Sequence, residues 1–307
     1  MEAVRQNPRL YSPEWFTHRA LSGLRKIGDD SWDYSDSLLL YVPGSDDEYE
    51  AVQEIDTPYH TLITAPERKS LQDIAPEIVN ELSNTFEYVD MGPGTEHKEQ
   101  FIFDAAKEQG KQILYRPTDI SDKYLQLSTA YASNQGLKVE PIKSSFEELP
   151  EKLNEVTNQR FVSLGLTYGN YNPPEILELL KEVAGKEGVA FINAQIRERA
   201  DMEAIKNIYA EAAPALVAAK IRMLGLDPEK DISESEVTDE VKIWYTLSNS
   251  SAALEAKGMK VGDRLLVFQS LRPTLERLKS NIAKVFPDYK LLDNGESFVG
   301  ALLFAAK

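Results

Sequence analysis

Residues 86–121, FEYVDMGPGTEHKEQFIFDAAKEQGKQILYRPTDIS, decide the fold of this chain. The stretch begins with an apolar run, turns at two glycines and continues as an amphipathic helical pattern over 96–109. It then returns to a second apolar run at 112–116. Apolar runs that are separated by one amphipathic helix are typical of a strand–helix–strand unit with parallel strands. The sequence therefore predicts that a parallel sheet starts at Phe86.

The same alternation continues toward the C-terminus. Three further apolar runs, each followed by a helical pattern, lie at 137–142, 160–165 and 188–196. Five such units in series predict an α/β protein with a doubly wound sheet and helices on both faces. Two closing runs at 289–292 and 297–305 flank an Asp-Asn-Gly-Glu turn, which predicts a C-terminal β-hairpin.

The remaining residues follow a different pattern. Residues 1–85 are turn-rich, with short helical segments expected at 12–24 and 71–82 and a proline-punctuated stretch at 57–66. Residues 197–270 open with a long helical pattern, and further strands of this segment are expected at about 243–248 and 265–270. The acidic run Ser233–Glu236 is interpreted as a solvated face or a helix start. We interpret 86–196 with 271–307 as the sheet domain that binds a cofactor. Residues 1–85 and the insertion 197–270 are interpreted as a mainly helical substrate cap.

The composition excludes several classes of protein. The chain has 307 residues, 50 acidic and 34 basic side chains, and a net charge of −16, whereas nucleic-acid and anionic-membrane binding need a cationic surface. It has no cysteine, and His18, His60 and His97 are scattered, so no metal site is expected. We find neither an apolar run of the roughly 20 residues that span a bilayer nor a secretory pattern. The expected location is the cytoplasm and the expected partner a small molecule, with the oligomeric state left open.

The first candidate site is the glycine-rich loop Gly92-Pro93-Gly94-Thr95 between the first strand and its helix. Glycines let the backbone turn sharply and approach a ligand closely, and a helix N-terminus favours a negative group. In open α/β sheets such a loop lies at the carboxyl edge of the strands, where ligands bind. The alternative is a tight turn without a ligand.

The second candidate is Asp119 at the end of the second strand, 27 positions after Gly92. An acidic residue there can accept hydrogen bonds from the ribose hydroxyls of a nucleoside cofactor. The alternative is a role at the start of the next helix, although Ser121 can cap that helix itself. The third glycine of a dinucleotide fingerprint is missing, since His97 follows Glu96. This absence disfavours NAD or FAD, and an NAD-dependent oxidoreductase is the weaker reading.

The third candidate is the loop that begins at Gly165, after the fourth strand. It is long and polar, and it lies at the same edge of the predicted sheet as the first two sites. Asn170 offers both a donor and an acceptor to a substrate. A local turn before the helix that begins at Pro173 is an equally good interpretation.

Taken in order, these blocks resemble the histidine-specific S-adenosylmethionine-dependent methyltransferase family. That family includes the L-histidine Nα-methyltransferase of ergothioneine biosynthesis and related amino-acid N-methyltransferases. The resemblance covers roughly residues 45–307. It is carried by DMGPGTEHK at 90–98, PTDIS at 117–121, SSFE at 144–147 and GLTYGN at 165–170.

The resemblance implies S-adenosyl-L-methionine as the cofactor and a Rossmann-like methyltransferase fold. It assigns Lys98 and the glycine-rich loop to the methionine end of the cofactor and Asp119 to the ribose. Ser145 and Phe146 fall beside the adenine, where the family usually has Asp-Phe, so Ser145 is a departure. The cofactor residues that the resemblance implies are Gly92, Pro93, Gly94, Thr95, Lys98, Asp119, Ser145, Phe146 and Gly165.

The resemblance also implies residues that position the substrate. Asn170 matches the asparagine that holds the amino-acid head group, and Tyr209 the tyrosine that contacts the carboxylate. Tyr59 is similar to a further head-group tyrosine, but the family pattern Tyr-x-x-Thr-Arg-x-Glu is broken after it into His-Thr-Leu-Ile-Thr. A helix-face core tyrosine is the alternative for Tyr209.

The largest departure lies in residues 265–270, LLVFQS, which resemble a Thr-Glu-Val-Ser run whose Glu and Ser hold the imidazole in the histidine enzyme. Aligned on Ser270, the glutamate position holds Phe268, although a shift of one residue would place Gln269 there. An unpaired imidazole N–H costs about 1–3 kcal/mol, so we predict a substrate other than histidine. The predicted function is N-methylation of an amino-acid-like amine. The alternative is a non-catalytic relative that binds a cofactor or a partner protein.

Overall fold

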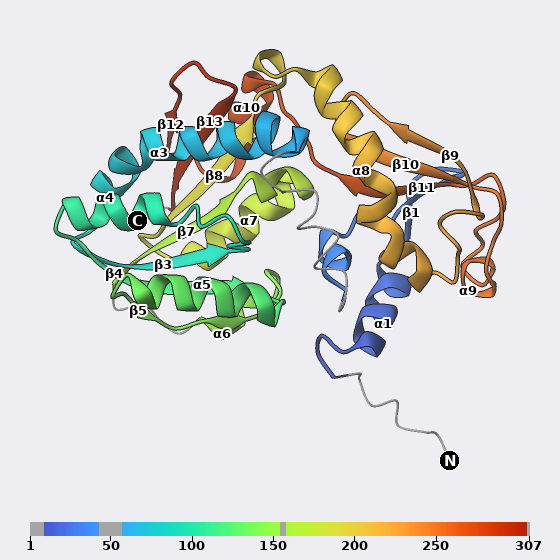
Figure 1. Ribbon diagram of the computed structural model, residues 1–307, viewed down its shortest axis with the longest axis horizontal. Coiled ribbons are helices and arrows are strands. Elements are labelled where there is room, and N and C mark those ends of the chain that lie inside the picture. Colours follow the sequence, from blue (N-terminus) through green and yellow to red (C-terminus); the bar gives the residue numbers. More distant parts are fainter. Residues whose placement is uncertain (1–8, 43–56, 154–157, 306–307) are drawn as a thin grey trace. The chain divides into compact units, whose positions relative to one another are not determined.

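The computed structural model describes residues 9–42, 57–153 and 158–305, and the chain divides into two compact units (Figure 1). The first unit comprises Met1–Glu54 and Glu203–Leu271, and the sheet unit comprises Ile55–Met202 and Arg272–Lys307. Residues 55–85, which we assigned to the cap from the sequence, therefore group with the sheet unit. The role of the first unit as a substrate cap stays a prediction.

The sheet unit is built on strands in the order β12-β13-β8-β7-β3-β4-β5, with β6 beside β4. Strands β3 to β8 pair in parallel, β13 is antiparallel to β8, and β12 is antiparallel to β13. This arrangement confirms the doubly wound sheet and the closing hairpin. The strands are β3 (Thr85–Met91), β4 (Gln112–Asp119), β5 (Lys138–Val139), β6 (Ile142–Lys143), β7 (Gln159–Gly165), β8 (Val189–Gln195), β12 (Tyr289–Leu292) and β13 (Phe298–Phe304).

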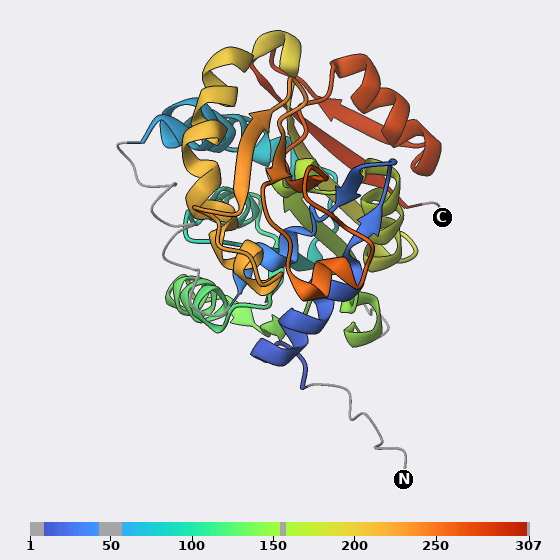
Figure 2. The same ribbon diagram turned by 90° about the vertical axis from the view of Figure 1, so that its right-hand side faces the viewer.

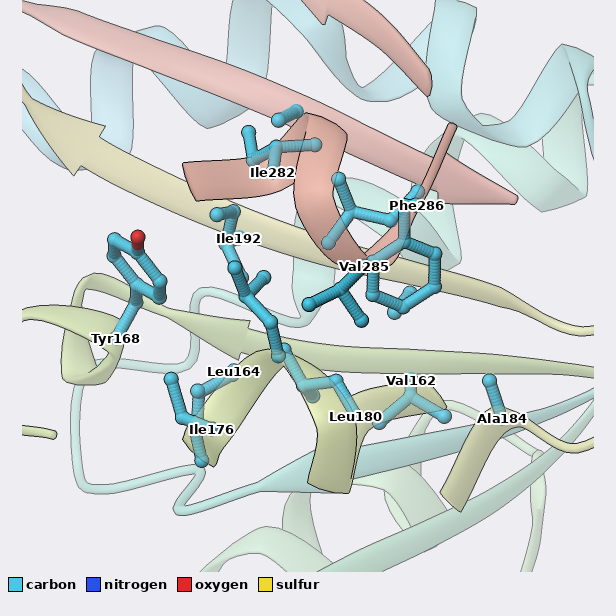
Figure 3. Close-up of a cluster of buried hydrophobic side chains, with 14 of the residues drawn as sticks. Val162, Leu164, Tyr168, Ile176, Leu180, Ala184, Ile192, Ile282, Val285 and Phe286 are labelled. Carbon is cyan, nitrogen blue, oxygen red and sulfur yellow. The ribbon is translucent and has the colours of Figure 1, made fainter. Parts of the chain in front are cut away.

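Helices cover both faces of this sheet because successive residues of each central strand point to opposite sides. In β8, Phe191 joins the core beneath α3 and α4, whereas Ile192 joins the core beneath α7 and α10 (Figure 3). These two successive residues are both apolar, as expected of strands that are buried on two faces. The helices of this unit are α3 (Ala65–Asn80), α4 (Gln100–Glu108), α5 (Asp122–Asn134), α6 (Leu149–Lys152), α7 (Pro173–Ala184) and α10 (Leu275–Val285).

Helix α3 starts earlier than the sequence pattern predicted. We expected a helix over 71–82, after a proline-punctuated stretch. In the structure the π-helical turn η2 (His60–Thr64) leads directly into α3. Pro66 lies in the first turn of α3, where a proline is tolerated. Because of this early start, the N-terminal half of α3 can contact residues at the carboxyl edge of the sheet.

The first unit contains a second sheet, in the order β1-β2-β11-β10-β9, in which β2 runs parallel to β11 (Figure 2). The two strands predicted here are confirmed as β10 and β11. The run Ser233–Glu236, interpreted as a solvated face or helix start, lies in the exposed strand β9. The elements are α1 (Pro13–Gly23), β1 (Arg25–Lys26), β2 (Ser31–Asp33), η1 (Ser37–Tyr41), α8 (Met202–Met223), β9 (Ile232–Val237), β10 (Lys242–Leu247), α9 (Ala252–Glu255) and β11 (Arg264–Gln269).

A β-bulge in this second sheet faces a buried lysine. The pairing of β10 with β11 skips Val267, so its carbonyl lies outside the ladder. Lys220 of α8 donates to that carbonyl at 2.7 Å and to the carbonyl of Asp36 at 3.2 Å, and its Nζ lies 4.7 Å from the ring centre of Tyr34. Burial lowers the pKa of Lys220 to about 7, against the opposing effect of the Asp36 and Asp33 carboxylates.

Candidate functional site

The glycine-rich loop lies at the point where the strand order of the sheet unit reverses. Strands β4 and β5 follow β3 on one side, and β7 and β8 follow on the other. Ligands of open α/β sheets bind at such a switch point, outside the carboxyl ends of the strands. Gly92 and Gly94 adopt φ of +75° and +65°, and Gly165, at the end of β7, adopts +57°. The structure therefore brings two of the predicted loops to the same edge of the sheet, after the neighbouring strands β3 and β7.

The glycine-rich loop does not lead directly into a helix. We expected the helix to begin at about Glu96, but α4 begins at Gln100, and residues 95–99 form turns. His97 adopts a φ of +48°, its ring stacks on Tyr131 at 4.0 Å, and its Nδ1 lies 3.3 Å from Glu99 Oε1. The helix N-terminus is thus displaced from the loop by a turn that is rich in charged residues.

Carboxylates surround the loop. Asp90, the buried residue before the last of β3, accepts a hydrogen bond from the Tyr115 hydroxyl at 2.9 Å. Burial, followed by the nearby Glu99 carboxylate, raises the pKa of Asp90 to about 8. Within the described part of the chain, Glu96 Oε1 and Glu99 Oε2 are buried without a hydrogen-bond partner. Buried acceptors of this kind suit a cationic ligand.

Lys98 is held by two of these carboxylates. Its Nζ lies 2.9 Å from Glu67 Oε2 and 3.3 Å from Glu96 Oε2. Burial alone would lower the pKa of Lys98, but the two carboxylates outweigh it, and the pKa is raised above its usual value. Two of the three donors of the ammonium are used in this way, which leaves room for one further acceptor.

Asp119 ends β4 as predicted, and its Oδ1 accepts from the backbone N–H of Ser121 at 2.8 Å. The Ser121 hydroxyl caps α5 by accepting from the N–H of Tyr124. The capping role thus belongs to Ser121, as expected. An ionised carboxylate accepts about four hydrogen bonds, so Asp119 can still serve a ribose.

The segment after β6 supplies the remaining cofactor candidates. Ser144 and Ser145 are buried, and the Ser144 hydroxyl has no hydrogen-bond partner among the described residues. A Cβ atom at Gly92 would meet Phe146 at 3.4 Å, and the ring centres of Phe146 and Tyr171 are 6.0 Å apart. The Phe146 ring therefore lies beside the glycine-rich loop.

Two of the predicted substrate residues lie in the sheet unit. Asn170 is the last residue of the 3₁₀ helix η3 (Leu166–Asn170) and is partly buried. Tyr59 immediately precedes η2 and is also partly buried. Asn170 follows β7 directly, at the same sheet edge as the glycine-rich loop. The roles of both residues stay predictions.

The other three substrate residues form one buried cluster in the first unit. The Tyr209 hydroxyl of α8 donates to the Ser270 hydroxyl at 3.1 Å. The rings of Tyr209 and Phe268 stack with their centres 5.7 Å apart. All three residues are at most 5% exposed. The contact shows that these positions, 61 residues apart in sequence, belong to one local environment.

Sequence reasoning missed Glu67, a buried residue of α3. Besides Lys98, it contacts the backbone N–H of Leu166, which lies 3.1 Å from Glu67 Oε1. The signal was present, because Thr64 and Glu67 retain the Thr-x-x-Glu spacing of the family pattern Tyr-x-x-Thr-Arg-x-Glu.

In the described part of the chain, no group of three or more His, Asp or Glu side chains could hold a metal ion. None of the described helices is both long enough and apolar enough to span a bilayer.

The parallel sheet, its switch-point glycines and the acid at the end of β4 define an α/β protein that binds a nucleoside cofactor. A family model described as histidine-specific methyltransferase, SAM-dependent, matches residues 37–211. The match spans more than half of the chain, so the chain belongs to this family. It is accordingly an S-adenosylmethionine-dependent methyltransferase.

Solved structures of low sequence identity share parts of the arrangement. An S-adenosylmethionine-dependent methyltransferase from Clostridium acetobutylicum ATCC 824 is 14% identical, with 84% of this chain and 99% of that chain covered and a TM-score of 0.43. The PH0226 protein from Pyrococcus horikoshii OT3 is 13% identical, with coverages of 78% and 91% and a TM-score of 0.44. No curated protein matches the chain. Because both TM-scores are below 0.5, the assignment rests on the family match and the sheet order.

Proposed function

We propose that the chain transfers a methyl group from S-adenosylmethionine to the amine of an amino-acid-like small molecule whose side chain is not an imidazole. The observation that carries this proposal is the buried cluster of Tyr209, Phe268 and Ser270. It presents two aromatic rings and two hydroxyls that bond each other. Such a surface suits an aromatic or apolar side chain.

A histidine side chain fits this cluster poorly. The Phe268 ring cannot accept the imidazole N–H, and a buried donor without a partner costs about 1–3 kcal/mol. The Tyr209 hydroxyl donates to the Ser270 hydroxyl at 3.1 Å. An aromatic or apolar side chain needs no hydrogen-bond partner and would leave that bond intact.

The residues at the carboxyl edge of the sheet fit the cofactor. Asp119 offers acceptors for ribose hydroxyls, and the unpartnered oxygens of Glu96 and Glu99 suit its positive charge. When bound, S-adenosylmethionine supplies a methyl group that its sulfonium already activates. The task that remains for the chain is to orient the amine and exclude water.

Asn170 is the residue that we assign to the amine-bearing head group. Its side-chain amide carries both donors and an acceptor, so it can bind an α-carboxylate and an amine together. It follows β7 at the edge where the glycine-rich loop lies. A protonated amine has no lone pair for attack, and Asn170 cannot remove its proton. Solvent is the acceptor that we assign to that proton.

The proposal is tested by two measurements. A methyl-transfer screen should give turnover with aromatic amino acids or amines and little with histidine. Calorimetry should show that Asp119→Ala weakens cofactor binding at least tenfold, whereas Asp122→Ala, an exposed carboxylate three residues further on, does not. Preferred turnover of histidine would refute the substrate class. Equal binding by both variants would remove Asp119 from the cofactor site.

A further inference from the structure

Glu67 lies between the segment that follows β3 and the segment that follows β7. It is 3% exposed, and each of its carboxylate oxygens contacts one of these segments. We infer that Glu67 is a positioning residue that couples the cofactor loop to the loop that carries Asn170. The inference rests on the proposed function only where it concerns the substrate.

The first contact joins Glu67 to the cofactor side. Lys98 Nζ donates to Glu67 Oε2 at 2.9 Å, and the Lys98 side chain is 28% exposed. Lys98 follows the glycine-rich loop by four residues. The neighbouring Arg68 donates to the backbone carbonyl of Glu96, so this turn has a second attachment to α3 that does not involve Glu67. Loss of the Glu67 charge should therefore change where the ammonium lies without releasing the whole turn.

The second contact joins Glu67 to the substrate side. Glu67 Oε1 accepts from the backbone N–H of Leu166, the first residue of η3, at 3.1 Å. The same oxygen would lie 3.4 Å from a Cβ atom at Gly165, whose φ of +57° and ψ of −143° are accessible to glycine alone. Asn170 is the last residue of η3. The carboxylate thus determines where the chain leaves β7 and turns toward Asn170.

A carboxylate is the side chain that can make both contacts. Each of its oxygens accepts one donor, and its charge matches the Lys98 ammonium. Glutamine keeps the shape but has one acceptor and one donor group. In Glu67→Gln, therefore, either Leu166 or Lys98 faces an NH₂ group. Loss of a charge-assisted hydrogen bond of this kind corresponds to roughly a tenfold change or more in an equilibrium constant.

The test compares Glu67→Gln, Lys98→Met, the double variant and Glu87→Gln in the full chain. Glu87 is the matched control, because it is a buried carboxylate of the same unit that pairs with Arg160 at 3.3 Å. The two readouts are cofactor binding by calorimetry and amide hydrogen exchange of residues 165–170. The exchange readout needs neither cofactor nor substrate.

We expect Glu67→Gln to weaken cofactor binding and to accelerate exchange at Leu166, each by about tenfold or more. Lys98→Met should weaken cofactor binding alone, and the double variant should bind no more weakly than Lys98→Met. Glu87→Gln should change both readouts less than twofold. Additive losses of affinity in the double variant, or unchanged exchange at Leu166, would overturn the coupling. If Glu67→Gln does not fold, the coupling is overturned when Lys98→Met binds the cofactor as tightly as the wild type.

Failure of the proposed function gives a different result. In that case no amine is methylated, while the binding and exchange changes of Glu67→Gln persist. If amines are methylated and Glu67→Gln leaves their KM unchanged at saturating cofactor, the substrate side of the inference is wrong and the proposed function stands.

Discussion

Replacement of Lys220 by methionine should abolish a pH dependence of stability that the wild-type chain shows above neutral pH. The side chain is fully buried, and its pKa falls to about 7 from a usual 10.5 because burial disfavours the ammonium. Between these two values the unfolded chain binds a proton that the folded chain does not. Stability therefore rises with pH across this window, since the destabilisation that comes from burying the lysine is complete below pH 7 and vanishes near 10.5.

The size of the effect follows from the width of the window. One proton of difference changes the free energy of unfolding by about 1.4 kcal/mol per pH unit. From pH 7.5 to 9.5 the wild type should gain about 2–3 kcal/mol relative to Lys220→Met. The absolute stability of the variant is less informative, because methionine also leaves the carbonyls of Val267 and Asp36 without their donor. The difference between the two proteins in how the free energy of unfolding changes with pH, in contrast, depends only on the proton of Lys220.

The assay is urea unfolding at several pH values between 7 and 10, monitored by a probe in the first unit such as Trp32 fluorescence. Lys206→Met is the matched control on the same helix, since Lys206 forms ion pairs with Glu203 and Asp239 and its pKa is raised instead. The control should keep the wild-type slope. Identical slopes for wild type and Lys220→Met would refute the reasoning, because the lysine would then be charged in the folded state.

Three further predictions concern Gly165, Asp90 and the hydrogen bond between Tyr209 and Ser270. Gly165→Ala should lower the free energy of unfolding by about 1–3 kcal/mol, measured in denaturant, because its positive φ is strained for alanine; an unchanged midpoint would contradict this. Asp90, with its pKa raised to about 8, should make cofactor affinity rise up to about tenfold from pH 7 to 9 as the carboxylate ionises, and Asp90→Asn should flatten that profile in calorimetry. Asp90 should also make the sheet unit less stable as pH rises from 4 to 8, since the folded state then holds a proton that the unfolded state has lost. Tyr209→Phe should cost about 1 kcal/mol through the lost bond to Ser270, and equal stability would show that this bond contributes nothing.

The sheet unit was predictable because its strands are buried on two faces. Residues 189–192 of β8, Val-Ala-Phe-Ile, are apolar at four successive positions, and they alternate between the cores on the two faces of the sheet. The run at 137–142 was harder, since the structure has two strands of two residues, β5 and β6, in its place. Strands β1 and β2 carry almost no periodic signal, because they have two and three residues. Their existence depends on partners that are distant in sequence.

The candidate site also contains some residues that the sequence predicts and others that it does not. Gly92 and Asp119 were accessible from sequence because each follows a recognisable strand. The helix start at Gln100 was not, because the turn at 95–99 depends on contacts such as the stack of His97 on Tyr131. Glu67 was missed for a related reason. Its partners are 31 and 99 residues away, and only tertiary packing brings them together.

The parallel pairing of β2 with β11 has a consequence for how the chain acquires its structure. It joins Ser31–Asp33 to residues 264–266, and the Trp32 indole donates to Asp263 across 231 positions. Loop closure of this length slows folding, because its entropic cost precedes the contacts that reward it. During synthesis, β2 has only the two-residue strand β1 as a partner until the ribosome has passed Leu266. The N-terminal residues therefore emerge first yet are among the last to find their place, and any fragment that ends before β11 leaves Trp32 exposed.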